Sequence, residues 1–189
     1  MKLILAQGNP GSKYTATRHN TGFLVIDQLA DQLGVKFVER SKFSSLIAET
    51  SIASQKVLLV KPTTFYNETG QAARQLVDFY KLDAKEDVLV IHDDIALPFG
   101  SVRVRLKGSS AGNNGIKSLN AHLGEDYSRI RIGISNDLKL RMKDNVSFVL
   151  APFTKSEITT LSDTVAPCVR QLVTDFCEGT LGSVSHSLL

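Results

Sequence analysis

The chain has 189 residues, of which 42% are hydrophobic and 22% charged, and its formal net charge at neutral pH is +3. This composition is that of one ordinary globular domain, residues 1–189, and it argues against intrinsic disorder. The small positive charge permits RNA binding but falls far short of the dense basic clusters of a dedicated nucleic-acid module.

The amino terminus predicts a cytoplasmic protein. Its apolar run, residues 2–6, meets a Gly/Pro turn at residues 8–11 and is too short for a signal peptide. No later segment approaches the roughly 18 to 20 apolar residues that cross a bilayer, so we expect no membrane association.

Six apolar runs bounded by turn residues predict strands, which in chain order are 2–6, 44–52, 56–60, 87–92, 101–106 and 128–134. The continuous apolar runs at 57–60 and 88–91 predict burial on both faces of a sheet. The alternating runs at 101–106 and 128–134 predict one polar face.

Helical periodicity is present between and after these strands. It predicts helices over 21–33 and 69–80 and a long last helix from a capping box at Thr154 and Glu157 to Gly179, kinked at Pro167. The alternation predicts a single-domain α/β sandwich with a twisted mixed β-sheet flanked by helices.

The two cysteines, Cys168 and Cys177, fall on that last helix. At 1.5 Å per residue they would lie about 13 Å apart, beyond disulfide reach. No Cys/His spacing of the zinc type is present, so we expect two core-filling thiols and no metal.

Polar side chains collect just after the predicted strands. Asn9, Asn67, Asp93 and Asn114 each follow a strand in the chain, and His19 lies a short step beyond the first of them. Loops that follow strands converge at the usual ligand crevice of an open α/β sheet. We therefore expect these side chains to form one site.

An imidazole, a carboxylate and several amides suit ester or amide hydrolysis by water. Imidazole is a base near neutral pH, an aspartate can fix its tautomer, and amides bind polar groups without adding charge. Taken singly, each residue also has an ordinary structural explanation: His19 as a helix cap, Asn9 as a turn residue before Pro10, and residues 113–115 as a turn or helix start.

Long motifs in register extend beyond these residues. They are GNPGSKYTATRHNTGF (8–23), KPTTFYNETG (61–70), HDDIALPFG (92–100), RLKGSSAGNNGIKSL (105–119), RIRIGI (129–134) and FVLAPFTKSE (148–157). In these motifs and their order the chain resembles the bacterial-type peptidyl-tRNA hydrolase family, which cleaves the ester between a peptide and the terminal ribose of tRNA. The resemblance covers nearly the whole chain.

The resemblance implies roles for the collected residues. His19 would be the general base that activates water, and Asp93 would orient it. Asn9 would lie against the scissile region, while Asn67 and Asn114 would position the substrate and the water. Such an ester is reactive enough for a mechanism without metal or cofactor.

The resemblance also implies contacts with the tRNA end. Tyr14 and Phe65 would pack the terminal adenosine. Positive side chains near the site are candidates for sequence-independent phosphate contacts, with a solvated strand-edge charge as the alternative for each: Arg103, Arg105, Lys107, Lys117 and Arg131. We expect peptidyl-tRNA as the partner and a monomeric enzyme.

Some positions depart from the family pattern. Asn113 and Ala111 stand where a His and a Gly are customary, Tyr66 replaces a Met that lines the peptide groove, and Ala96 replaces an acid. We expect Tyr66 and Asn113 to remain in the substrate site and to change its affinity or pH response. The segment 136–145 also differs from the customary Gly/Pro-rich form and would change how the site is covered.

Two alternatives remain at this stage. One is a non-catalytic RNA-binding homologue that keeps the fold but has altered motifs around residues 66 and 113. The other is a nucleotide-binding protein that uses residues 8–14 as a phosphate loop, although this segment lacks the GK[ST] ending of a P-loop and the further glycine of a dinucleotide fingerprint.

Overall fold

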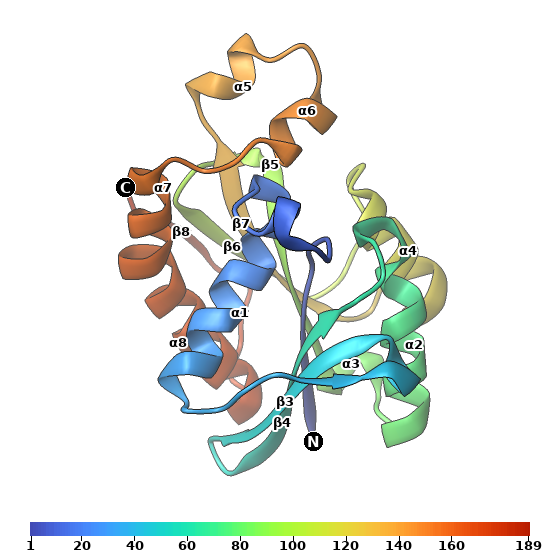
Figure 1. Ribbon diagram of the computed structural model, residues 1–189. Coiled ribbons are helices and arrows are strands. Elements are labelled where there is room, and N and C mark those ends of the chain that lie inside the picture. Colours follow the sequence, from blue (N-terminus) through green and yellow to red (C-terminus); the bar gives the residue numbers. More distant parts are fainter.

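The computed structural model describes residues 1–189, which form one eight-stranded β-sheet with helices on both faces (Figure 1). The strand order is β2-β3-β4-β1-β5-β7-β6-β8. The central strands run parallel to one another: β4 (Gln55–Pro62), β1 (Lys2–Ala6), β5 (Val88–Pro98) and β7 (Ser128–Ser135). The edge strands are antiparallel: β3 (Ser45–Ile52) and β2 (Val38–Arg40) on one side, β6 (Ser101–Arg105) and β8 (Ser185–Ser187) on the other. The predicted mixed α/β sandwich is confirmed.

Two hydrophobic clusters hold the layers together. On one face α1 (Thr21–Gln32) and α8 (Ala166–Glu178) cover the sheet, and on the other lie α2 (Thr69–Tyr80) and α4 (Asn114–Leu123), as Figure 1 shows. Successive residues of β1 alternate between them, since Ile4 packs in the first cluster and Leu3 and Leu5 in the second. Residues 57–60 and 88–91 alternate between the two clusters in the same way and are buried on both faces, as predicted.

The remaining helical segments are short. They are α3 (Ala84–Asp87), α5 (Asp137–Arg141), α6 (Asn145–Leu150), α7 (Lys155–Thr160), a π-helical turn (Leu161–Val165), and 3-10 turns at Ser12–Tyr14, Arg18–Asn20, Ser41–Phe43 and Tyr66–Glu68. No helix is both long enough and apolar enough to cross a membrane.

The long last helix is interrupted before Pro167. It begins at the predicted capping box, in which Thr154 and Glu157 exchange hydrogen bonds, and ends at Gly179, whose φ is +77°. Pro167 lies in the first turn of α8, where its missing N–H is not needed, and the π-helical turn directly precedes this helix. Cys168 and Cys177 are both free thiols on α8, as expected.

Two strand predictions were wrong. β5 does not end at residue 92 but continues to Pro98, so Asp93 belongs to a strand rather than to a loop. β7 does not expose a polar face: Arg129 is buried because its guanidinium donates to the carbonyl oxygens of Gly108 and Ser109, each at 2.9 Å. The 108–109 loop thus covers a face that alternation alone assigned to solvent.

Candidate active site

A cavity of about 770 Å³ opens beyond the carboxyl ends of β1 and β4 and along the second half of β5. It brings together most of the predicted site residues, namely Asn9, Tyr14, His19, Phe65, Tyr66, Asn67, Asp93, Arg105, Lys107, Asn113, Asn114 and Arg131. The expectation that the residues following the strands meet at one crevice is therefore confirmed as geometry.

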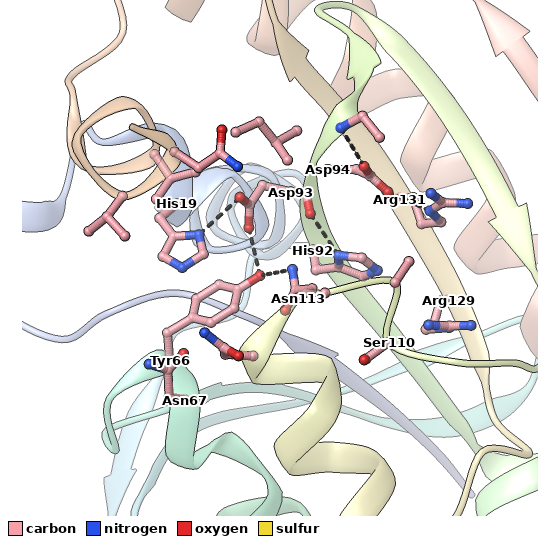
Figure 2. A pocket seen from close by; sticks show the side chains of 18 of the residues that line it. His19, Tyr66, Asn67, His92, Asp93, Asp94, Ser110, Asn113, Arg129 and Arg131 are labelled. Atoms are coloured by element: carbon pink, nitrogen blue, oxygen red, sulfur yellow. Dashed lines mark hydrogen bonds and ion pairs between the residues drawn. The ribbon is translucent and has the colours of Figure 1, made fainter. Parts of the chain in front are cut away.

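His19 and Asp93 form a hydrogen-bonded pair in this cavity (Figure 2). His19 Nδ1 lies 2.9 Å from Asp93 Oδ2, and the Asp93 side chain is buried. Because a carboxylate only accepts, Nδ1 carries the proton and Nε2 is left as the basic nitrogen. The imidazole lines the cavity and is 18% exposed, so a water molecule in the cavity can reach the ring.

The His19 segment is fixed to the sheet by its neighbours. Asn20 accepts from the Asn9 backbone N–H at 2.8 Å and donates to the Asn9 carbonyl at 2.9 Å. At Gly22 a Cβ would lie 2.6 Å from the carbonyl oxygens of Gln7 and Ile91, so only glycine lets α1 start this close to β1 and β5. This close approach places the imidazole over the strand ends.

The side-chain amide of Asn9 is hydrogen-bonded through its oxygen. Its Oδ1 accepts from the Tyr66 backbone N–H at 3.0 Å, and the residue is buried. The Nδ2 donor is therefore the part of Asn9 that can serve a ligand. Asn67 and Asn114 are exposed at the cavity rim, and Phe65, also at the rim, is 57% exposed.

Tyr66 and Asn113 line the cavity, and Tyr66 bonds directly to Asp93 while Asn113 bonds to Tyr66. The Tyr66 hydroxyl donates to Asp93 Oδ1 at 2.6 Å and accepts from Asn113 Nδ2 at 3.0 Å. Burial and the neighbouring Asp93 charge raise the pKa of Tyr66 well above its ordinary value, so the phenol keeps its proton.

His92 is a second, buried histidine in the lining of the cavity. Its Nδ1 donates to the Asp93 carbonyl at 2.7 Å, while Nε2 is buried without a hydrogen-bond partner. Burial lowers the pKa of His92 to about 4, so the ring is neutral at physiological pH. The motif showed a histidine here, but sequence reasoning did not assign it to the site.

The predicted basic residues separate into groups. Arg105, Lys107 and Arg131 all line the cavity, but only Arg131 is ion-paired, with Asp94 at 2.5 Å. Lys117 lies on α4 in a neighbouring shallow groove that shares Asn67 and Asn114 with the cavity. Arg103 lies outside the cavity, with its Nε donating to Ser185 Oγ of β8 at 3.2 Å.

Helix α6 contributes apolar side chains to the cavity lining, namely Val146, Val149 and Leu150. The segment 136–145, which departs from the customary Gly/Pro-rich form, contains α5, and both α5 and α6 rise above the sheet in Figure 1. No group of three or more His, Cys, Asp or Glu side chains is placed to hold a metal ion.

Comparison with known proteins identifies the family of this fold and site. The model of the family described as Peptidyl-tRNA hydrolase matches residues 3–186. The chain belongs to the peptidyl-tRNA hydrolase family. Its resemblance to that family in sequence motifs is thereby confirmed.

Peptidyl-tRNA hydrolases from several bacteria are similar over most of their length. That of Exiguobacterium sibiricum is 48% identical over 180 residues, which are 94% of either chain. That of Fusobacterium nucleatum is 45% identical over 157 residues, 83% of this chain and 80% of the relative. The crystal structure of the peptidyl-tRNA hydrolase from Acinetobacter baumannii superposes with a TM-score of 0.85 at 32% identity, covering 95% of this chain and 89% of that one.

Proposed function

We propose that residues 1–189, as one domain, hydrolyse the ester between a peptide, or an N-blocked amino acid, and the 3′ ribose of tRNA. This activity would recycle tRNA from prematurely released peptidyl-tRNA. The observation that carries the proposal is the His19–Asp93 pair, joined at 2.9 Å in the wall of a polar cavity. Membership of the peptidyl-tRNA hydrolase family supports the same substrate.

In the proposed mechanism His19 Nε2 takes a proton from a water molecule as the water oxygen attacks the ester carbonyl carbon. Asp93 orients the imidazole and stabilises the imidazolium that forms. Amide donors of Asn9, Asn67 and Asn114 position the substrate and water and stabilise the tetrahedral oxyanion. The intermediate collapses with cleavage of the bond to the ribose 3′ oxygen, which takes the proton from the imidazolium. The products are a peptide carboxylate and tRNA with a free 3′ hydroxyl.

The tRNA end would bind along the polar side of the cavity. Tyr14 and Phe65 would stack on the terminal adenosine, and their position in the cavity lining supports this role. Arg105 and Lys107 are the best candidates for phosphate contacts. Arg131 joins them only if substrate phosphate competes with Asp94. We further propose that the enzyme acts as a monomer, without metal or cofactor.

The test is release of tRNA from N-acetyl-aminoacyl-tRNA by the purified chain, with unblocked aminoacyl-tRNA as the comparison substrate. We expect preferential, multiple-turnover cleavage of the blocked ester that a chelator does not reduce. The His19→Ala variant should lose roughly 10²- to 10⁴-fold in kcat, the usual contribution of a general base. His186→Ala, which removes an exposed histidine of β8, is the matched control and should retain the parent rate.

Several outcomes would contradict the proposal. A His19→Ala protein with the parent rate would exclude this mechanism, and inhibition by the chelator would exclude metal independence. Tight tRNA binding without turnover by the parent chain would instead support a non-catalytic RNA-binding homologue.

A further inference from the structure

The side chains of Tyr66 and Asn113 form a continuous hydrogen-bonded chain that ends on His19 (Figure 2). Asn113 Nδ2 donates to the Tyr66 hydroxyl at 3.0 Å, and the hydroxyl donates to Asp93 Oδ1 at 2.6 Å. Asp93 Oδ2 in turn accepts from His19 Nδ1 at 2.9 Å. Each of the two carboxylate oxygens therefore has its own donor.

This arrangement limits how the Asp93 carboxylate can rotate. Both Tyr66 and Asp93 are 2% exposed, so the bond between them is sheltered from competing water. A hydrogen bond to a charged acceptor is stronger than one between neutral groups, and more so away from solvent. Rotation of the carboxylate away from His19 would break the bond to Tyr66.

The Tyr66 ring also restrains the imidazole directly. The rings of His19 and Tyr66 stack with their centroids 3.6 Å apart and their planes 15° from parallel. Tilting of the imidazole is blocked on that side. Tyr66 thus fixes both members of the pair, the imidazole by its ring and the carboxylate by its hydroxyl.

Asn113 sets the position of the Tyr66 hydroxyl. Its Oδ1 caps α4 by accepting from the Ile116 backbone N–H at 3.0 Å, and this fixes Nδ2 as the atom that faces Tyr66. A Cβ at Gly115 would overlap the Tyr66 ring, so the missing side chain there lets the ring lie against the start of α4. The start of α4 is therefore shaped around Tyr66.

We propose that Tyr66 and Asn113 are positioning residues, which hold the Asp93 carboxylate and the His19 imidazole in the geometry that activates water. The inference rests on the proposed function. It replaces the substrate-binding role that the sequence predicted for these two residues with a role in a buried chain of hydrogen bonds. Tyr66 acts through Asp93 and His19, and Asn113 acts through Tyr66.

The test compares steady-state parameters of Tyr66→Phe, which keeps the ring and loses the hydroxyl. We expect kcat to fall about tenfold, the order for loss of one hydrogen bond to a charged group, with KM within about twofold. Without the Tyr66 donor, the Asp93 carboxylate stabilises protonated His19 more strongly. The acidic limb of the kcat/KM profile should therefore move to higher pH. His92, Asp94 and Arg131, the other titratable groups around Asp93, are unchanged in this variant.

Asn113→Ser tests the outer link, because serine can still cap α4 but cannot reach Tyr66. The double variant Tyr66→Phe with Asn113→Ser should be no slower than Tyr66→Phe alone, since both act through one hydroxyl. Tyr127→Phe is the matched control: Tyr127 is also buried, and its hydroxyl donates to Asn120 Oδ1 outside the cavity. That variant should keep the parent kcat and pH profile.

A raised KM with unchanged kcat would restore the substrate-binding role and overturn the proposal. The proposal would also be overturned if the fold-losses in kcat of the two single variants multiplied in the double variant.

A measurement without substrate separates this proposal from the proposed function. The ¹H–¹⁵N signal of His19 Nδ1–H should be sharp in the parent and in Tyr127→Phe, and broadened in Tyr66→Phe. An unchanged signal in Tyr66→Phe would overturn the positioning role, whatever the parent hydrolyses.

Discussion

At the scale of single residues, the site is built largely from amides that connect two neighbours each. Asn20 donates to and accepts from the Asn9 backbone, Asn9 accepts from the Tyr66 backbone, and Asn113 joins the α4 cap to the Tyr66 hydroxyl. An amide carries a donor and an acceptor on one rigid plane, so it can connect segments without a charge to be desolvated. These amides therefore fix the Asn9, Asn20 and Tyr66 turns and the start of α4 relative to one another without adding a charge.

His92 gives a prediction for the pH dependence of stability. Its pKa is lowered by burial from an ordinary value near 6.5 to about 4, because a second proton would occupy Nε2, which has no partner. On acidification the unfolded chain binds this proton first. The contribution of neutral His92 to the free energy of unfolding is therefore fully present above about pH 6.5. It is lost as the pH falls toward 4, by up to about 3 kcal/mol.

The measurement is the free energy of urea unfolding between pH 7.5 and 4.5 for the parent and His92→Gln. The loss on acidification should be smaller in His92→Gln, whereas His186→Gln, which changes an exposed histidine, should follow the parent. Parallel curves for the parent and His92→Gln would show that His92 does not contribute to this pH dependence.

At the scale of elements, a buried arginine joins the His19 turn to the segment before the last helix. Arg18 is 1% exposed, donates to the Pro152 carbonyl at 2.9 Å and pairs with Glu157 Oε1 at 2.8 Å. Its guanidinium also lies over the rings of Phe148 and Phe153. The turn that presents the imidazole is thus held to α6 and α7 as well as to β1.

Removal of this connection should destabilise the whole fold. Arg18→Ala leaves Glu157 without its buried partner and opens a space beside two aromatic rings, so we expect a loss of about 3 kcal/mol in the free energy of unfolding. Arg170→Ala, at an exposed position of α8, should change it by no more than about 0.5 kcal/mol. Urea denaturation of both variants provides the check, and equal effects would contradict a structural role for Arg18.

Elements with a strong local pattern were predictable from the sequence, and those defined by their neighbours were not. α1, α2 and the central strands follow hydrophobic periodicity and were predicted within one or two residues, apart from the far end of β5. The three-residue edge strands β2 and β8 consist of exposed residues and carry no such pattern, because they exist only by pairing with β3 and β6.

The same distinction holds within the site. The meeting of Asn9 and the Tyr66 turn follows from the rule that parallel strands end at one edge, and Asp93 joins them because it lies on β5 just past the last residue paired with β1. Asn20 and Arg129, in contrast, bond to backbone atoms of other segments, and nothing in the residue types reveals those partners. The sequence could indicate which side chains gather, but not which of them are already engaged with each other.

At the scale of the whole molecule, the positive side chains around the cavity differ in whether they already have a hydrogen-bond or ion-pair partner. Arg129 is held by the 108–109 carbonyls and Arg131 by Asp94, while Arg105 and Lys107 line the cavity without an acidic partner. With a net charge of only +3, attraction of tRNA depends on these few positions rather than on a broad field.

Salt dependence should distinguish these charges. Arg105→Gln should raise KM for N-acetyl-aminoacyl-tRNA and lower the slope of log(kcat/KM) against log[salt] by about one, the value for one lost phosphate contact. Arg103→Gln, two residues earlier on β6 and outside the cavity, should keep the parent slope. The same slope in both variants would exclude Arg105 as a phosphate contact.

The joint role of the Asn113 amide has a consequence for how the protein can change over evolutionary time. Tyr66 brings a hydroxyl into a buried position, and Asn113 supplies its donor while keeping the α4 cap. Because the two departures from the family pattern are hydrogen-bonded to each other, we expect them to be coupled. In an alignment of relatives, a tyrosine at the position of residue 66 should occur together with asparagine at that of residue 113, and the two should be gained and lost together.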